Sequence, residues 1–365
     1  MKNNLRKTIE KILKFFAQKL LNKLKPDIIG ITGSVGKSST KEAIYTVLSK
    51  SKRFEGRVSK NYGNLNEEIG VPLSIFGFQN PVRWFMWPFI LIILFFKFFA
   101  YYFRIIKYPK ILILELSANK VGDISYLTSF VKPHIAIVTA IGPAHIKYFG
   151  SLDSIIKEKG RLLEVLTRND YAILNKDDLE VRNMNKRTVA KVIYFSGEKD
   201  ESEKEPAKII GKIYGLNKKE IEDNLKKFVN LPHRLNVINL VDNFTIIDDT
   251  YNANPLSMGR ALKKLSAVSR QLKGKRRVVV LGDMLELGSY SEKAHQDVAQ
   301  KASSVADLLI TVGPNFAKTK SDHHFNNSEK AAEFLLKEAH KEDIILIKGS
   351  RGMKMEVIVQ KLQNN

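Results

Sequence analysis

The segment DIIGITGSVGKSSTKEAIYTVLSK, residues 27–50, decides the fold. It begins with an apolar run that predicts a buried strand, continues into a glycine-containing loop and ends in a helical segment. The glycines let such a loop curl, so that backbone N–H groups and the helix N-terminus can cradle phosphate oxygens. This order of strand, loop and helix predicts a phosphate-binding site.

The phosphate-loop candidates include a lysine that can neutralise terminal phosphates and a serine whose hydroxyl can reach Mg²⁺. The candidates are Gly33, Ser34, Val35, Gly36, Lys37, Ser38 and Ser39, with Lys37 and Ser38 in those two roles. The strict pattern has a glycine five places before Gly36, where this chain has Ile31. A loop that binds no nucleotide therefore remains the alternative.

Further apolar runs alternate with helical segments along the rest of the chain. They read ILILEL, HIAIVTAIG, YAILN, VIYFS, FTIIDD, RRVVVLG, DLLITVG and DIILIKG. This alternation predicts parallel sheets with helices on both faces, in which ligands bind beyond the carboxyl ends of the strands. The 365 residues suffice for two such cores, and we expect a boundary after residue 232, where the alternation restarts. The charged stretch 197–208 predicts a solvated connector.

Composition narrows the classes of function. The chain has 60 basic and 38 acidic residues, a net charge of +22, which favours an anionic partner. It has no cysteine, which excludes disulfides, thiolate metal sites and thiol nucleophiles. No zinc-finger or helix-turn-helix pattern accompanies the charge, so no nucleic-acid partner is expected.

The N-terminal segment, residues 1–26, predicts a basic amphipathic helix that ends at Pro26. Its apolar positions recur every three or four residues: Leu5, Ile9, Ile12, Phe16, Leu20 and Leu24. Lysines occupy much of the remaining surface. Such a helix can lie on an anionic membrane or dock its apolar stripe on its own domain, and the two alternatives carry equal weight here.

A second unusual segment, WFMWPFILIILFFKFFAYYF at residues 84–103, lies within an insert of about 81–108. Twenty apolar residues can span a hydrocarbon core of ~30 Å. A single crossing, however, would place Lys37 and Glu115, at the end of the following strand ILILEL, on opposite sides of the membrane. Arg83, Lys97 and Arg104 fall at multiples of seven and predict a narrow basic stripe on a helix lying in the membrane interface. Packing on the protein itself or on a second copy is the alternative. With the N-terminal helix, the insert predicts a cytoplasmic protein, peripheral on the inner face of the cell membrane.

Several motifs occur in a fixed order downstream of the phosphate loop. They are NYGNLNEEIGVPLSIF, LELSANKVGDISYL, TAIGPAHIKYFGSLDSIIKEKGRLLEVL, LPHRLNVI, DDTYNANPLSM, GDMLELGSYSEKAH and LIKGSRGMKME. In this order they resemble the Mur ligases from about residue 26 to the C-terminus. The resemblance implies a central phosphate-loop ATPase domain over residues 27–232 and a Rossmann-like C-terminal ligase domain over residues 233–365.

The resemblance also implies a reaction. ATP and Mg²⁺ would be the cofactors, and a muramyl-peptide acceptor and D-alanyl-D-alanine would be joined through an acyl phosphate in peptidoglycan precursor synthesis. A ligase that adds another amino acid to a peptide or polymer, and a non-catalytic nucleotide-binding relative, remain alternatives. A monomer is expected.

Four groups of site residues follow from the resemblance. Glu115 and His145 are implied as Mg²⁺ ligands. Lys159 is implied as a lysine that carries a carbamate, although Lys157 lies two residues away and keeps the register open. The implied ATP contacts are Arg234, Asp249 and Asn252. Asn64 and Asn66 are implied as substrate contacts, or else as turn formers, and Ser350 and Arg351 as contacts to the incoming amine, or else as part of a turn.

Two departures from the family pattern concern the substrates. Only about 26 residues precede the first strand, so the separate domain that grips the UDP-sugar is expected to be absent. A His-Asn motif that meets the nucleotide is missing between residue 195 and the linker. The acceptor is therefore expected to be either UDP-linked or lipid-linked, and ATP affinity to differ from that of relatives.

Overall fold

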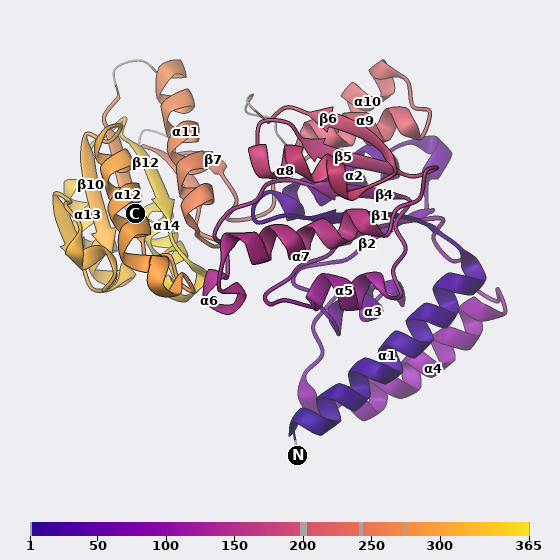
Figure 1. Ribbon diagram of the computed structural model, residues 1–365. Helices are drawn as coiled ribbons and strands as arrows, with labels where there is room; N and C mark the ends of the chain where they lie inside the picture. Colours follow the sequence, from indigo (N-terminus) through magenta and orange to yellow (C-terminus); the bar gives the residue numbers. More distant parts are fainter. Residues whose placement is uncertain (1, 198–202, 241–243, 273–274, 365) are drawn as a thin grey trace. The chain divides into compact units, whose positions relative to one another are not determined.

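The computed structural model describes residues 2–197, 203–240, 244–272 and 275–364 (Figure 1). Its contacts divide the chain into two compact units, each built around one six-stranded sheet. Unit 1 is Met1–Ile141 with Asp153–Phe228, and unit 2 is Gly142–Leu152 with Val229–Asn365. Both units are of the α/β class, which confirms the predicted fold class.

The sheet of unit 1 is parallel throughout and has the order β2-β3-β1-β4-β5-β6. Its strands are β1 (Asp27–Thr32), β2 (Val58–Lys60), β3 (Ile111–Glu115), β4 (Ile135–Val138), β5 (Tyr171–Asn175) and β6 (Lys191–Phe195). The central strands are buried on both faces, which explains their nearly continuous apolar sequences. The order places the phosphate loop after β1 beside the carboxyl end of β3.

Helices cover both faces of this sheet. In Figure 1, α2 (Lys37–Ser49), α9 (Lys204–Ile213) and α10 (Lys218–Leu225) lie above it, and α5 (Asp123–Thr128) and α7 (Leu152–Glu164) lie below it. The shorter helices of the unit are α3 (Gly70–Ile75) and α8 (Leu179–Asn183), with 3₁₀ turns η1 (Lys52–Phe54), η2 (Trp84–Met86) and η3 (Met184–Arg187).

The charged connector predicted at residues 197–208 is only partly described. Residues 198–202 lie outside the described residues. Lys204–Ile213 forms α9, so the prediction is wrong for the end of the stretch. The reason is amphipathicity: Ala207 and Ile210 are fully buried in the core of the sheet, while the charged neighbours face outward.

Two long helices, α1 (Lys2–Leu24) and α4 (Trp87–Tyr102), lie side by side in unit 1 and are called the helix pair below (Figure 1). The ring of Phe16 packs on Phe98 at 4.9 Å, and the amine of Lys23 lies over the ring of Tyr102 at 5.4 Å. The contact later in α1, at Lys23, is also the contact later in α4, at Tyr102, so the two helices run in the same direction. The N-terminal helix is confirmed, and it docks on its own unit through Ile9, Leu13, Ala17, Leu20 and Leu21. Of the predicted apolar stripe, Ile9 and Leu20 are buried, whereas Leu5 is exposed.

The predicted basic stripe of the insert is wrong. Arg83 precedes η2, and Arg104 follows α4 in a left-handed turn with φ 59°, so neither lies on the helix. Lys97 is on the helix, but its amine donates to the carbonyl of Phe76 at 3.0 Å. Phe76 is the C-terminal cap of α3, and a lysine is a favourable hydrogen-bond donor to the carbonyls at such a helix end. Among the described residues, one helical segment, Trp84–Tyr102, has the length and composition to cross a membrane.

The sheet of unit 2 has the order β11-β10-β9-β12-β8-β7. Its strands are β7 (Asn236–Asn239), β8 (Thr245–Asp249), β9 (Arg277–Gly282), β10 (Leu308–Val312), β11 (His323–Phe325) and β12 (Ile344–Lys348). Five of these strands are parallel, but β7 pairs antiparallel with β8, contrary to the all-parallel prediction. The connection between β7 and β8 is too short for a crossover, and β7 alternates between half-buried and exposed residues, as an edge strand does.

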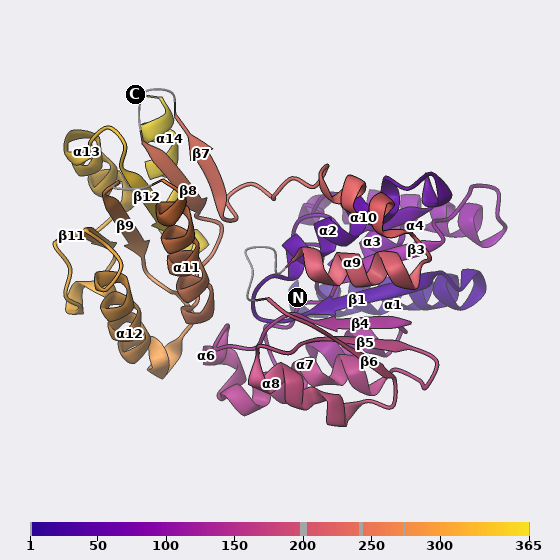
Figure 2. The same ribbon diagram turned by 90° about the horizontal axis from the view of Figure 1, so that it is seen from above.

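The helices of unit 2 form a layer on each face of its sheet (Figure 2). α13 (Ser328–Glu338) and α14 (Glu356–Gln363) pack on one face, and α11 (Pro255–Gln271) and α12 (Ser291–Ser303) on the other. The remaining elements are α6 (Ile146–Phe149) and the 3₁₀ turns η4 (Gly288–Tyr290), η5 (Phe316–Lys318) and η6 (Arg351–Met353).

Candidate active site

The phosphate loop joins β1 to α2 and is held by the adjacent strand end. The amide of Ser34 donates to the carbonyl of Ala140 at 2.7 Å, and the hydroxyl of Thr139 donates to the carbonyl of Val35 at 2.6 Å. Gly36 caps α2 in a left-handed conformation with φ 88°. Lys37 reaches back across the loop, and its amine donates to the carbonyl of Gly33 at 2.9 Å. The loop thus has the curled form that a phosphate group requires.

Gly33→Ala is expected to lower the stability of unit 1 by about 1–3 kcal/mol and to weaken ATP binding. Gly33 has φ 146°, and a Cβ there would lie 2.1 Å from Thr139 Oγ1 and 3.1 Å from the backbone of Ala140. The loop must therefore shift, and its amides with it. Thermal unfolding with and without ATP measures both effects. The control is Gly259→Ala on α11, where a Cβ meets nothing within 4 Å, and an unchanged ATP-induced shift in Gly33→Ala would contradict the prediction.

Glu115 is the centre of the polar cluster beside this loop. It ends β3 with 2% of its surface exposed, and Oε2 accepts the hydroxyl of Ser38 at 2.8 Å and lies 3.6 Å from the amine of Lys41. Oε1 accepts the amide of Asn66 at 3.0 Å. The structure therefore brings Ser38, Glu115 and Asn66 together, three residues that the sequence singled out separately.

Asn61 and Lys41 support Glu115 and were missed by the sequence reasoning. The side chain of Asn61 donates to the carbonyl of Glu115 and accepts its amide, both at 2.9 Å, which fixes the strand end. Burial lowers the pKa of Lys41, and the charge of Glu115 opposes that effect. Lys41 lies one helical turn after Lys37 on α2, so helical spacing from Lys37 was the signal that could have identified it.

Lys159 and Lys157 differ sharply in environment. Lys159 is buried in α7 with 3% exposure, whereas Lys157 is exposed. Burial, and next the charge of Lys37, lower the pKa of Lys159 to about 7, while Glu115 and two other carboxylates act in the opposite direction. Much of the Lys159 amine is therefore neutral at pH 7, which is the form that can react with carbon dioxide. The geometry favours Lys159 over Lys157 as the candidate.

The oxygen donors of this cluster fit Mg²⁺. Over residues 2–197, 203–240, 244–272 and 275–364 there is no group of three or more His, Asp or Glu side chains placed to hold a metal. Mg²⁺ needs no such group, because it is commonly bound by one or two protein oxygens together with phosphates and waters. The Ser38 hydroxyl and the Glu115 carboxylate supply two hard oxygens at the edge of the phosphate loop.

His145 lies in unit 2, at the start of α6, with φ 57°. Its Nδ1 is 2.5 Å from Oε2 of Glu286, an acidic residue of the GDMLELG motif. The joint metal role of His145 and Glu115 concerns residues of different units and stays a prediction.

The three ATP candidates of unit 2 surround the end of β8. Asp249 is buried, and its Oδ2 accepts the amine of Lys348 at 2.6 Å. The same amine donates to the carbonyl of Asn252 at 2.7 Å. Burial raises the pKa of Asp249 and lowers that of Lys348, so each depends on the other to stay charged. The guanidinium groups of Arg234 and Arg351 lie over the ring of Tyr251, at 4.0 and 5.3 Å.

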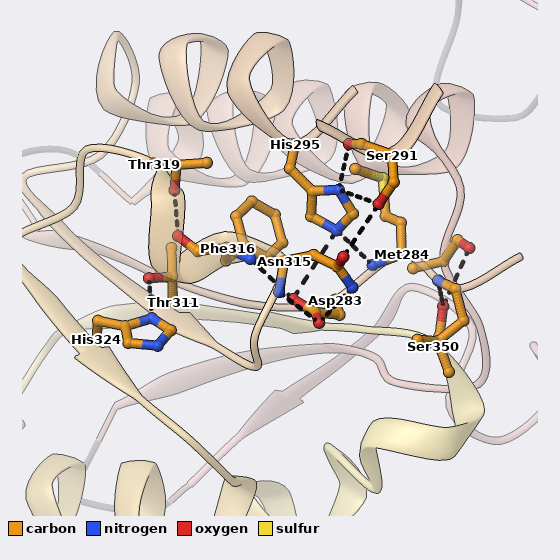
Figure 3. A network of polar contacts seen from close by, with 12 residues as sticks. Asp283, Met284, Ser291, His295, Thr311, Asn315, Phe316, Thr319, His324 and Ser350 are labelled. Atoms are coloured by element: carbon orange, nitrogen blue, oxygen red, sulfur yellow. Dashed lines mark hydrogen bonds and ion pairs between the residues drawn. The ribbon is translucent and has the colours of Figure 1, made fainter. Parts of the chain in front are cut away.

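Ser350 is part of a buried polar network that shapes the GDMLELG loop (Figure 3). Its hydroxyl accepts the amide of Leu285 at 2.9 Å, and its amide donates to the carbonyl of Asp283 at 3.0 Å. Asp283 in turn accepts the amides of Asn315 and Phe316. These contacts support the turn alternative for Ser350. Arg351 is exposed, as is Asn64, and their substrate roles stay predictions.

The fold and the site together define a phosphate-loop protein that joins a nucleotide-binding α/β unit to a second α/β unit. Such a chain has the parts that an ATP-dependent ligase requires: a phosphate loop, a buried carboxylate and a separate unit that can carry a second substrate. This chain belongs to the Mur ligase family. The family's "Mur ligase middle domain" matches residues 31–86 and 97–245, and its "Mur ligase, glutamate ligase domain" matches residues 233–351. The predicted family is thereby confirmed.

Individual relatives agree with the family. The chain is 26% identical to the UDP-N-acetylmuramoyl-tripeptide--D-alanyl-D-alanine ligase of Haemophilus influenzae, over 95% of this chain and 79% of that protein. It is 27% identical to the ligase of the same name from Bacillus subtilis, over 96% and 79%. The fold is similar to that of the MurF ligase of Thermotoga maritima in complex with ADP, with a TM-score of 0.79 and 23% identity over 97% of this chain and 83% of that chain.

Proposed function

We propose that this chain is an ATP-dependent ligase that joins D-alanyl-D-alanine to a muramyl tripeptide during synthesis of peptidoglycan precursors. The observation that carries the proposal is the contact between Ser38 and Glu115 beside a curled phosphate loop, with Lys37, Lys41 and Lys159 around it. Three lysines near one carboxylate form a positive site that suits a triphosphate. Relatives that align with nearly the whole chain are named UDP-N-acetylmuramoyl-tripeptide--D-alanyl-D-alanine ligases.

The reaction has two steps. A carboxylate oxygen of the acceptor attacks the γ-phosphate of ATP, so that the bond to ADP breaks and an acyl phosphate forms. The amine of D-alanyl-D-alanine then attacks the acyl carbon, phosphate leaves and the amine loses a proton. The loop amides and Lys37 would hold the phosphates and spread their charge, which is the main contribution a protein makes to phosphoryl transfer.

Mg²⁺, when bound, would neutralise phosphate charge beside Ser38 and Glu115. We propose that Lys159 carries a carbamate, which would turn its amine into an additional oxygen donor for the cation. Lys41 and Asn66 would keep the Glu115 carboxylate oriented through the contacts described above. His145, Arg234, Asp249 and Asn252 are proposed to act on the metal or nucleotide from unit 2.

The test measures phosphate release from ATP with D-alanyl-D-alanine and a muramyl tripeptide, each present or omitted. Release that requires both compounds supports the proposal. If release requires the tripeptide and a different amino component, found by screening amino acids, that component and not D-alanyl-D-alanine is the second substrate. No release with any pair would overturn the assignment as a ligase.

We propose further that the protein lies on the inner face of the cell membrane through the helix pair. α4 buries Ile90, Leu94 and Phe98 but leaves a broad apolar surface exposed. The exposed apolar side chains of α4 and its flanking residues are Trp84, Phe85, Met86, Phe89, Ile92, Ile93, Phe95, Phe96, Phe99, Phe103, Ile105 and Ile106. Exposed apolar patches of this kind mark interaction sites, and neighbouring lysines of α1 favour an anionic lipid surface as the partner.

The double variant Phe89→Glu/Phe96→Glu is expected to weaken binding to phosphatidylglycerol vesicles at least about tenfold, because each phenylalanine loses an apolar environment worth about 1.5–3 kcal/mol. Both side chains are more than 60% exposed, so the fold should tolerate the change. Co-sedimentation at low and high salt is the measurement. The control is Val189→Glu, equally exposed in unit 1 but outside the helix pair. Equal binding of the double variant and the control would contradict the proposal.

A further inference from the structure

Three consecutive side chains of the loop before α3 contact three different parts of unit 1. Asn66 donates to Oε1 of Glu115 at 3.0 Å. Glu67 accepts the side-chain amide of Asn119 at 2.7 Å, from the loop that follows β3. Glu68 lies 3.9 Å from the guanidinium of Arg6 on α1. One short loop thus runs from the carboxylate of the active site to the first turns of the helix pair.

This loop is tightly held. The side chain of Asn61 donates to the carbonyl of Leu65 at 2.9 Å, and Asn61 is fully buried. A Cβ at Gly70, where α3 begins, would lie 2.4 Å from the Cα of Leu65. The loop and α3 are therefore packed together with no room for an added methyl group, and a displacement of one must move the other.

α4 and the segment that follows it contact the other end of α3. The amine of Lys97 donates to the carbonyl of Phe76, and the hydroxyl of Tyr108 donates to the carbonyl of Ile75 at 2.9 Å. On α1, the carbonyl of Glu10 accepts the hydroxyl of Tyr126 from α5 at 3.2 Å. The exposed apolar surface is thus fixed to the same short elements that carry Asn64 and Asn66.

Part of the segment that supplies this surface lies outside the family match. The middle-domain match stops at residue 86 and resumes at residue 97, so the unmatched part is the first portion of α4. The phosphate loop, residues 33–39, and the strand of Glu115 lie within the matched parts. The unmatched apolar residues are therefore attached to the loop of Asn64 and Asn66, whose implied role is to contact the substrate.

We infer that the acceptor is a muramyl peptide carried on a membrane lipid through a diphosphate, and is taken from the bilayer surface beside the helix pair. The inference rests on the proposed ligase function. A helix pair lying in the lipid interface would hold the loop with Asn64 and Asn66 next to the bilayer, where such an acceptor presents its sugar and peptide. The acceptor would be concentrated in the same surface as the enzyme, which raises its effective concentration. Lysines exposed on α1, among them Lys7, Lys11 and Lys19, suit the diphosphate as well as anionic headgroups.

The experiment compares two acceptors that differ only in the group on the diphosphate: the lipid-linked muramyl tripeptide in phosphatidylglycerol vesicles and the UDP-linked tripeptide in solution. Phosphate release with ATP and D-alanyl-D-alanine gives kcat/KM for each. The wild-type protein is expected to favour the lipid-linked acceptor by at least about tenfold. In Phe89→Glu/Phe96→Glu this ratio is expected to fall towards one, whereas Val189→Glu keeps the wild-type ratio.

Two results would overturn the lipid-linked acceptor, and a third would refute the ligase function. A wild-type ratio at or below one, with the UDP-linked acceptor used well, would overturn the inference and leave the ligase function standing. A high ratio that the double variant retains, in protein with a wild-type thermal unfolding curve, would also overturn it, because the helix pair would then not deliver the acceptor. Release with neither acceptor would refute the proposed function itself.

Discussion

Lys159→Met is expected to reduce ATP-driven phosphate release by at least about a hundredfold, the scale on which groups that hold and orient charge at a metal or phosphate act. Lys159 lies within the electrostatic field of Lys37 and Glu115, and burial lowers its pKa to about 7. Methionine has a similar length but cannot carry a carbamate or a charge. The measurement is the initial rate of phosphate release with saturating ATP and both substrates.

The matched control is Lys157→Met, on the same helix but exposed, which is expected to retain the wild-type rate. Lys159→Met is also expected to unfold at no lower temperature than the wild type, because an apolar group replaces a buried amine. Loss of rate without loss of stability separates a functional lysine from a structural one. A normal rate in Lys159→Met together with a large loss in Lys157→Met would move the role to Lys157.

The residues that the sequence identified correctly lie at the ends of apolar strands. Glu115 directly follows four buried residues, and Ser38 lies in the first turn of the helix after β1, which pairs with β3. Parallel neighbours end at the same edge of a sheet, so the meeting of these side chains follows from the alternation of strands and helices. The choice between Lys157 and Lys159 was also available from helical spacing, because Ile155, Lys159 and Leu162 lie on one buried face of α7.

Other features depend on contacts between distant segments, which a single sequence does not display. Asn61 is separated from Glu115 by more than fifty residues, and nothing in its local sequence shows that it holds that strand end. The contact that Lys97 makes depends on the position of α3, whereas the seven-residue spacing alone predicted a basic stripe on a helix in the membrane interface. Lys348 was recognisable in principle, because it follows the apolar run of β12 as Glu115 follows that of β3.

Lys348→Met is expected to lower the free energy of unfolding of unit 2 by about 3–5 kcal/mol, because it leaves the carboxylate of Asp249 buried without its cation. The amine of Lys348 is 2.6 Å from Oδ2 of Asp249, and both side chains are nearly inaccessible to solvent. The amide of Leu235 also donates to this carboxylate at 3.2 Å, and the charge of Arg234 lowers the pKa of Asp249. Denaturant unfolding of the wild type and the variant is the measurement.

Two further variants identify the cause of this loss. Adding Asp249→Asn to Lys348→Met removes the buried, unpaired carboxylate charge. The double variant should therefore be more stable than the sum of the two single changes predicts. Lys226→Met breaks an ion pair with Asp223 that is exposed to solvent, and no measurable change is expected. Full stability in Lys348→Met would show that Asp249 is not charged in the folded protein. A neutral Asp249 would lack the negative charge that makes a carboxylate a strong hydrogen-bond acceptor, so the ATP contact implied for Asp249 would lose its electrostatic basis.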